Sequence, residues 1–351
     1  MSNRKVFIKQ MLAAGALSII PDVVLSQVNL FSLQQNGPTD KIWACLLHLS
    51  HNMWVEYSTP TSPFRGYRPY LQLSEPLWVD VRGKMAKEGM NMVVIDLGDA
   101  IKYESHPEIA VNQAWSTARL KDELAKFRKM GIEPIPKLNF AAGHDTWLGK
   151  YSRMVSTEPY YQVCKDLIAE VIALFDKPRF FHLGMDEENV EDQRYHDLIT
   201  VRQHDLWWHD FYFLVDQVEK GGSRAWIWSD YMWKNAEVFF KKMPKSVVQS
   251  NWYYEETYDE SNVAVKAYKD LEAHGYDQIP TGGFYKNNPK NIMSTVQYCD
   301  QQIPDYRLLG YLQTFWKPNT EEFREQILTG IELTGNAKKW FEKNHKTNNK
   351  K

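Results

Sequence analysis

The stretch Arg179-Phe-Phe-His-Leu-Gly-Met-Asp-Glu-Glu188 is the strongest indication of the architecture of this chain. It begins with an apolar and aromatic run that is typical of a buried β-strand. It then passes a glycine and ends on three consecutive acids, Asp186, Glu187 and Glu188. Carboxylates directly after a buried strand are typical of the carboxyl-terminal mouth of a β/α-barrel. We therefore interpret Asp186 and Glu187 as a candidate catalytic pair and place Glu188 outside it.

The segments on either side alternate between short apolar runs and amphipathic helical patterns. Apolar runs of this kind are typical of parallel strands covered by helices. Together with the opening stretch they make eight strand–helix units, which predict an α/β fold of the (β/α)8 TIM-barrel class. An open doubly wound sheet is the alternative, but it would require a glycine-rich phosphate loop after the first strand, and none is there. The seven further predicted strands are 42–50, 91–97, 133–140, 224–228, 246–252, 278–285 and 307–315. The predicted helices are 76–88, 114–130, 159–175, 205–220, 236–243, 262–274, 291–302 and 321–341.

The composition narrows the class of function. The chain has 351 residues, of which 43% are hydrophobic and 25% charged, and this length allows two average domains or one large barrel. The net charge of -2, without a basic face before the C-terminal tail, argues against nucleic-acid binding. Aromatic residues make up 14%, with 13 Trp and 19 Tyr. Such rings stack on the apolar faces of sugars, so this content favours a carbohydrate partner over a merely large core.

Cysteine spacing predicts neither a metal site nor a disulfide framework. Cys45, Cys164 and Cys299 fit no zinc pattern, and their number is odd. Each lies in an apolar segment, so we expect buried free thiols, no metal and no cofactor.

The first residues have the features of a bacterial export signal. Arg4, Lys5 and Lys9 precede the apolar run 11–20, and small residues follow up to a cleavage site near Ser26. Lys5 stands where a twin-arginine signal has its second arginine, so Tat-like and Sec routes both stay open. The apolar run is too short to span a membrane. We expect an exported, periplasmic protein with no membrane span after signal removal; a retained amphipathic helix is the alternative.

These patterns divide the chain into four segments. We predict a signal peptide at 1–27, a linker at 28–40, a single barrel domain at 41–343 and a frayed tail at 344–351. The tail is rich in Lys and Asn, which favours fraying of a terminal helix.

Polar and aromatic residues are frequent at the carboxyl-terminal ends of the predicted strands, where the active site of a TIM barrel lies. Asp186 and Glu187 are adjacent, and side chains alternate along a strand, so the strand must end near Met185 for both carboxylates to reach the mouth. Neighbouring carboxylates raise each other's proton affinity, which lets one remain protonated as a general acid. The other residues at these ends are His48, His51, Asp96, Asp99, Asn139, His144, Trp228, Asp230, Trp252, Tyr253, Tyr285, Gln313 and Trp316.

Four motifs in chain order resemble one family. His182-Leu-Gly-Met-Asp-Glu187 is similar to the His-x-Gly-Gly-Asp-Glu motif of glycoside hydrolase family 20, the β-N-acetylhexosaminidases. The segment 131–144, which ends in Ala-Gly-His, resembles that family's third strand, which ends Pro-Gly-His. Trp226-Ile-Trp-Ser-Asp230 resembles its fifth-strand motif, and Gln313-Thr-Phe-Trp316 its last pocket strand.

The resemblance implies a substrate-assisted mechanism on a carbohydrate. In that family the acetamido oxygen of the substrate attacks the anomeric carbon. The resemblance assigns Asp186 to orienting the acetamido group and Glu187 to acid and then base catalysis. Trp228, Trp252 and Trp316 would enclose the acetamido methyl group, and Tyr285 or Tyr253 would donate to its carbonyl. The other candidate substrate-binding residues are Arg65, Asn139, His144, His182, Asp230 and Gln313.

The chain departs from the family pattern at three positions. Met185 replaces the second glycine of the motif, and Lys137 and Asn139 stand where the family usually has acids. Two alternatives therefore stay open. One is a two-carboxylate glycosidase that uses Glu187 with Asp230 on another sugar. The other is a sugar-binding barrel without catalysis.

Overall fold

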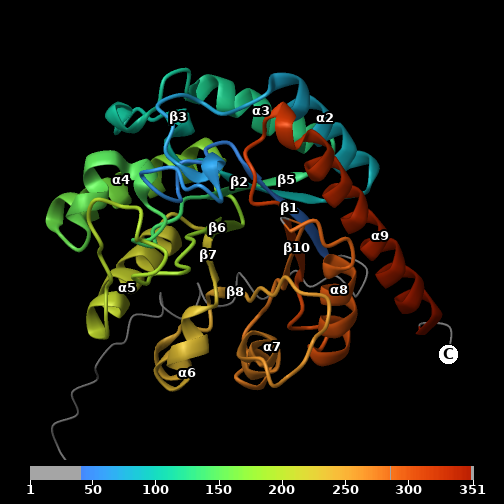
Figure 1. Ribbon diagram of the computed structural model, residues 1–351. Coiled ribbons are helices and arrows are strands. Elements are labelled where there is room, and N and C mark those ends of the chain that lie inside the picture. The colour runs from blue at the N-terminus through green and yellow to red at the C-terminus, as the bar shows by residue number, and fades with distance from the viewer. Residues whose placement is uncertain (1–40, 285, 349–351) are drawn as a thin grey trace, which may run out of the picture. The chain divides into compact units, whose positions relative to one another are not determined.

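The computed structural model describes residues 41–284 and 286–348 (Figure 1). The predicted signal peptide and linker, Tyr285 and the last three residues lie outside this part. Within it, the structure contains no helix with the length and apolarity needed to cross a membrane.

Eight parallel strands form the barrel predicted from the sequence. Their order in the sheet is β8-β7-β6-β5-β2-β1-β10-β9. Parallel bridges from Gln249 to Gln278 and from Trp252 to Thr281 close the remaining gap between β8 and β9. There Ile279 N donates to Gln249 O at 2.9 Å. The strands are β1 (Ile42–His48), β2 (Met92–Asp96), β5 (Glu133–Lys137), β6 (Phe180–His182), β7 (Arg224–Trp228), β8 (Val248–Ser250), β9 (Thr281–Gly283) and β10 (Gly310–Thr314).

A helix follows each of these strands and covers the outside of the barrel (Figure 1). The (β/α)8 prediction is therefore confirmed. The sequence did not indicate the short β3 (Ile101–Lys102) and β4 (Trp115–Ser116), which pair in the segment between β2 and α3. The outer helices are α2 (Glu75–Lys87), α3 (Thr117–Lys129), α4 (Glu158–Leu174), α5 (Asp205–Lys220), α6 (Tyr231–Lys242), α7 (Val263–Ala273), α8 (Asn291–Gln302) and α9 (Arg324–Asn348).

Two helices differ from their predicted bounds by more than three residues at one end. α6 begins at Tyr231, and the non-helical backbone of Asn235 divides it, so the predicted helix at 236–243 is the part after this irregularity. α9 continues to Asn348, so residues 344–348, which we expected to fray, are helical. His345 explains this extension, because its ring stacks on Phe341 at 4.1 Å and its Nε2 lies 2.7 Å from Asp300.

A polar layer fills the barrel below its mouth. The register places His48, Asp96, Lys137 and His182 side by side on four neighbouring strands. Lys137 Nζ lies 2.5 Å from Asp96 Oδ2, and His48 Nδ1 lies 3.3 Å from the same oxygen. All four side chains are buried, so the lysine and the aspartate neutralise each other inside the barrel. Lys137 therefore belongs to the barrel interior rather than to the surface of the mouth.

Candidate active site

The chain leaves β6 through a series of left-handed residues. The strand ends at His182, three residues before the end we predicted, and Gly184, Met185 and Glu187 have φ of 74°, 74° and 50°. A side chain on Gly184 would collide with Asn139, so only glycine fits there. Because this backbone is not extended, consecutive carboxylates need not point to opposite faces. This is how Asp186 and Glu187 both approach His144.

Asn139 holds the turn and orients Asp186. Its Oδ1 accepts from the backbone N–H groups of Ala141 and Met185 at 3.1 and 3.2 Å. Its Nδ2 donates to Asp186 Oδ1 at 2.8 Å. The carboxamide therefore joins the loops after β5 and β6 and leaves the second oxygen of Asp186 facing His144.

His144 lies between the two candidate catalytic acids. Its Nε2 is 3.6 Å from Asp186 Oδ2 and 3.3 Å from Glu187 Oε2. Burial would lower the pKa of this imidazole, but the charge of Asp186 and the contact with Glu187 outweigh burial and raise the pKa to about 9. The ring is therefore an imidazolium at neutral pH, and it lies within ion-pair distance of both acids.

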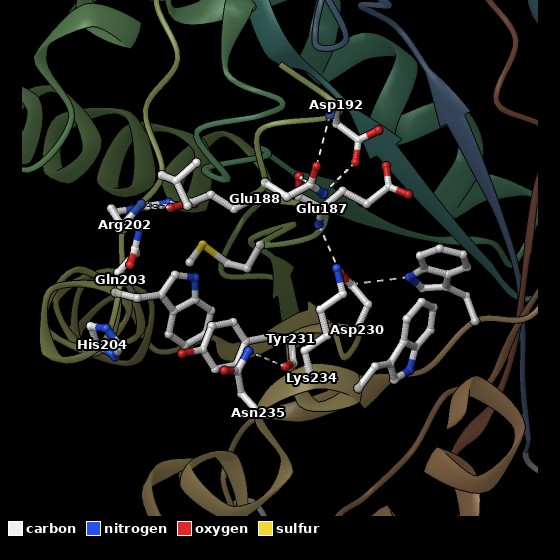
Figure 2. Close-up of a pocket in the computed structure, with 16 residues that line it drawn as sticks. Glu187, Glu188, Asp192, Arg202, Gln203, His204, Asp230, Tyr231, Lys234 and Asn235 are labelled. Carbon is white, nitrogen blue, oxygen red and sulfur yellow. Dashed lines mark hydrogen bonds and ion pairs between the residues drawn. The ribbon is translucent and has the colours of Figure 1, made fainter. Parts of the chain in front are cut away.

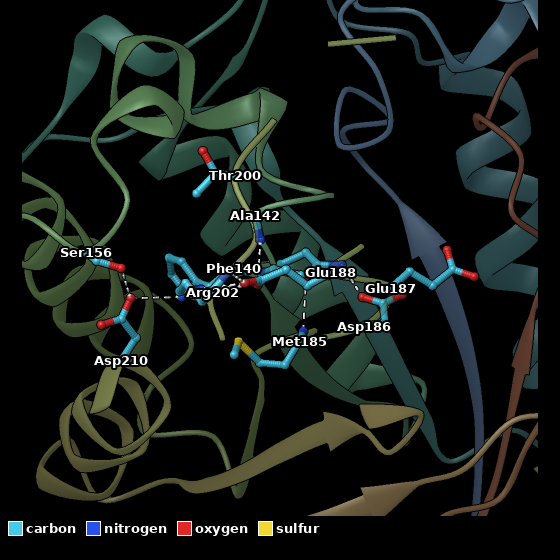
Figure 3. Close-up of polar contacts among 12 residues, drawn as sticks. Phe140, Ala142, Ser156, Met185, Asp186, Glu187, Glu188, Thr200, Arg202 and Asp210 are labelled. Carbon is cyan, nitrogen blue, oxygen red and sulfur yellow. Dashed lines mark hydrogen bonds and ion pairs between the residues drawn. The ribbon is translucent and has the colours of Figure 1, made fainter. Parts of the chain in front are cut away.

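Glu188 points away from this pair and belongs to a buried ion-pair network (Figure 3). Arg202 donates to it through Nε at 2.9 Å and Nη2 at 2.5 Å, and the Ala142 backbone N–H donates to it at 3.0 Å. Arg202 also donates to Asp210 at 3.2 Å. The interpretation of Glu188 as outside the catalytic pair fits this arrangement, because its carboxylate is fully engaged in holding the loop between β6 and α5.

Asp230 lies on the other side of Glu187. Its Oδ2 accepts from the Glu187 backbone N–H at 3.0 Å, and Trp252 Nε1 lies 3.4 Å from its Oδ1. Burial, and then the negative charge of Asp186, raise the pKa of Asp230 to about 7. This carboxyl group is thus partly protonated at neutral pH.

A pocket of about 390 Å³ opens beside Glu187 and Asp230 (Figure 2). Trp252 and Trp233 form one aromatic wall, with ring centroids 4.5 Å apart. Met185 also lines the pocket, so its side chain occupies space that the family's glycine would leave open. The remaining wall carries Tyr231 stacked on Trp207, the loop that contains Arg202 to His204, and Lys234 with Asn235.

The spacing of His144, Asp186 and Glu187 would also allow a metal ion to bind between them. One donor atom each from His144, Asp186 and Glu187 lies within 4.8 Å of the others, and this group is the only such cluster within the described residues. A metal ligand must be a deprotonated imidazole, whereas the pKa of His144 is raised to about 9. The ion-pair interpretation therefore accounts for the geometry better than a bound cation does.

Three tryptophans from distant segments meet at the mouth. The ring centroid of Trp316 lies 5.7 Å from that of Trp228 and 5.4 Å from that of Trp54. The ring centroid of Trp54 lies 5.1 Å from that of His144. Trp228 and Trp316 were predicted from the sequence. Trp54 was missed, because it lies in the long loop after β1 and only its aromatic character could have indicated it.

The structure brings Tyr254 rather than Tyr253 to the mouth. Trp316 Nε1 donates to Tyr254 Oη at 3.1 Å, and the Tyr254 ring stacks on Trp252 at 5.1 Å. Tyr253 instead packs against Tyr258. The sequence signal was ambiguous because adjacent tyrosines in a loop have no fixed alternation.

Two other predicted residues lie away from the mouth. Gln313 shares its face of β10 with Tyr311, whose hydroxyl donates to Val296 O in α8, so by strand alternation Gln313 faces the helices. The prediction that it contacts substrate is at odds with this placement. His182 faces the barrel interior and is fully buried, with its ring 4.4 Å from Trp228. It lies beneath the mouth and supports Trp228.

No family model matches the sequence, and no curated protein is similar to it. The fold is shared with solved structures at low sequence identity. The exo-β-N-acetylglucosaminidase of family 20 from Vibrio harveyi, in complex with N-acetylglucosamine, gives a TM-score of 0.58 at 12% identity over 84% of this chain and 54% of that chain. The chitobiase from Flavobacterium johnsoniae gives a TM-score of 0.58 at 18% identity over 80% of this chain and 47% of that chain. The β-N-acetylhexosaminidase from Bacteroides fragilis gives a TM-score of 0.57 at 16% identity over 84% of this chain and 65% of that chain.

These similarities confirm, for the fold, the resemblance to family 20 that the sequence motifs predicted. The chain spans about half to two thirds of the length of these structures.

Proposed function

We propose that this protein is a glycosidase that removes N-acetylhexosamine residues from glycans by a substrate-assisted, retaining mechanism. The observation that carries the proposal is the meeting of Asp186 and Glu187 at His144, at 3.6 and 3.3 Å, at the end of the fourth barrel strand. The family-20 fold supports the same chemistry.

Each residue then has a separate task. Glu187 donates a proton to the glycosidic oxygen while the substrate's acetamido oxygen attacks the anomeric carbon, and the C–O bond to the leaving group breaks. Glu187 then takes a proton from the water that opens the cyclic intermediate. Asp186, held by Asn139, hydrogen-bonds the acetamido N–H and stabilises the positive charge that develops there. A second protein nucleophile is not required, since the substrate supplies it.

His144 tunes this pair electrostatically. Its positive charge lies 3.3 Å from Glu187 and 3.6 Å from Asp186, so it attracts both side chains. The pocket beside Glu187 and Asp230, with Trp252 and Trp233 on its wall, offers room for a sugar attached to the hexosamine.

The two-carboxylate alternative is less well supported. Both oxygens of Asp230 face donors, the Glu187 backbone N–H and the Trp252 indole. A nucleophile would have to give up these contacts to reach an anomeric carbon. We also propose export to the periplasm, for which the basic and apolar N-terminal sequence is the support.

The test uses Glu187→Gln and a substrate with a poor leaving group, such as chitobiose. Loss of a general acid should reduce kcat by about 10²- to 10⁴-fold, whereas Glu191→Gln, an exposed acid on the same loop, should have no effect. An aryl glycoside with an activated leaving group should be affected less. A thiazoline mimic of the cyclic intermediate should bind the wild type and bind Asp186→Asn more weakly. Unchanged hydrolysis of chitobiose by Glu187→Gln would falsify the assignment.

A further inference from the structure

Two cations at the mouth form no ion pair within the part of the chain that the structure describes. Arg65, after β1, places its guanidinium 4.4 Å from the centroid of Trp54, and Lys317, after β10, places its ammonium 3.9 Å from that of Phe64. Neither makes an ion pair with a carboxylate among residues 41–284 and 286–348, and Arg65 Nε is buried without a hydrogen-bond partner. Both side chains are half-buried, so their uncompensated charge is costly in the absence of an anion.

His51 adds a third unpaired donor to the same place. It is buried, and its ring lies 5.9 Å from that of Phe64. Trp54 Nε1 donates to His51 Nε2 at 3.1 Å, so the neutral ring carries its proton on Nδ1. Burial, and then the charges of His48, Arg65 and Lys317, keep the pKa of His51 well below its usual value, so the ring is neutral. Its Nδ1 has no hydrogen-bond partner among the described residues.

The two cations Arg65 and Lys317 and the neutral donor His51 form one cluster. The indole ring of Trp54 separates this cluster from the candidate catalytic acids. Trp54 lies against Arg65 and also lies 5.1 Å from His144. A single ligand that reaches both places would combine a sugar at the acids with a negatively charged group at the cations. The burial of Lys317 and the charge of Arg65 lower the pKa of Lys317, and only the charge of Glu322 opposes this effect. An anion bound between the two cations would relieve their repulsion.

We propose that His51, Arg65 and Lys317 form a binding site for an oxyanion group, a sulfate ester or a carboxylate, carried by the glycan substrate. This inference rests on the proposed function for the identity of the ligand, but the site itself depends only on the three donors. Two cations and an N–H group match the charge and the acceptor capacity of such an oxyanion.

The experiment measures binding of N-acetylglucosamine 6-sulfate, of a glucuronic acid–N-acetylglucosamine disaccharide and of neutral N-acetylglucosamine by calorimetry. The intact wild-type chain should bind at least one anionic probe about tenfold more tightly than the neutral sugar. Lys317→Met should abolish this preference and leave the affinity for the neutral sugar unchanged, because the methionine keeps an apolar stem on Phe64. Which anionic probe is preferred distinguishes a sulfate from a carboxylate site.

Lys150→Met is the matched control, because Lys150 is an exposed lysine that also lies over an aromatic ring, Tyr151, at 4.9 Å. It should retain the preference. Equal affinity for all probes in the wild type, or an equal loss in both lysine variants, would overturn the proposal. If Glu187→Gln leaves hydrolysis intact while Lys317→Met still removes anion binding, the proposed function fails and the anion site stands.

Discussion

Replacement of Asp230 by asparagine should stabilise the folded protein, and the gain should grow with pH. Burial, and then the charge of Asp186, raise the pKa of Asp230 from 3.8 to about 7. The folded state therefore holds this proton more tightly than the unfolded state does. The stability linked to the proton is fully present below pH 3.8 and is lost as pH rises towards 7. Asparagine has no such proton and avoids this loss.

The size of the gain follows from the difference between the two pKa values. A difference of about 3 corresponds to roughly 4 kcal/mol at pH 8. Asp230 is partly exposed to solvent, which screens its charge, so we reduce this to about 2 kcal/mol. The carboxamide of the Asp230→Asn variant would retain an oxygen for the Glu187 backbone N–H, so that contact should survive the change.

The assay is urea denaturation of the wild type and Asp230→Asn at pH 5 and pH 8, with unfolding free energies from linear extrapolation. The exposed Asp122→Asn on α3 controls for the removal of one negative charge. In an Asp186→Asn background the gain should shrink, since Asp186 contributes to the raised pKa. A variant that is less stable than the wild type at pH 8, or equally stabilised at both pH values, would refute the reasoning.

Three further outcomes follow from the charges at and below the mouth. The pKa of His144 is about 9 against 6.5 for a free imidazole. Its ion pairs should therefore add up to about 3 kcal/mol to the free energy of unfolding below pH 6.5, and this contribution is lost as pH rises through 9. Chemical unfolding of the wild type and His144→Gln measures it, and a difference in stability that persists at pH 10 would contradict the prediction. Lys137→Met leaves Asp96 charged inside the barrel and should cost about 3–5 kcal/mol in chemical unfolding, with most of the loss recovered by adding Asp96→Asn; no recovery would argue against the pair. Glu188→Gln weakens the anchor of Arg202 and should cost about 3 kcal/mol while lowering kcat through the displaced loop; thermal unfolding and hydrolysis rates measure both, and an unchanged melting temperature would rule out the structural role.

The sequence by itself determined the barrel and the position of its acids. Apolar runs and helical spacing depend on neighbours within one element, so segments such as 224–228, 205–220 and 291–302 were predicted with the bounds that the structure has. The glycine and the acids after the fourth strand placed Asp186 and Glu187 at the mouth because the fold places every such strand end there.

Only the tertiary structure decided which side chains meet. Strand alternation turns Gln313 towards α8, a choice that depends on register with β9 and β1. Loops have no such periodicity, so the selection of Tyr254 over Tyr253 and the arrival of Trp54 beside His144 could not be predicted. The same holds for Arg65 and Lys317, which are far apart in sequence and approach each other because β1 and β10 are neighbours in the closed sheet. The opening stretch specified the acids, and the loops around it specify their charges and their surroundings.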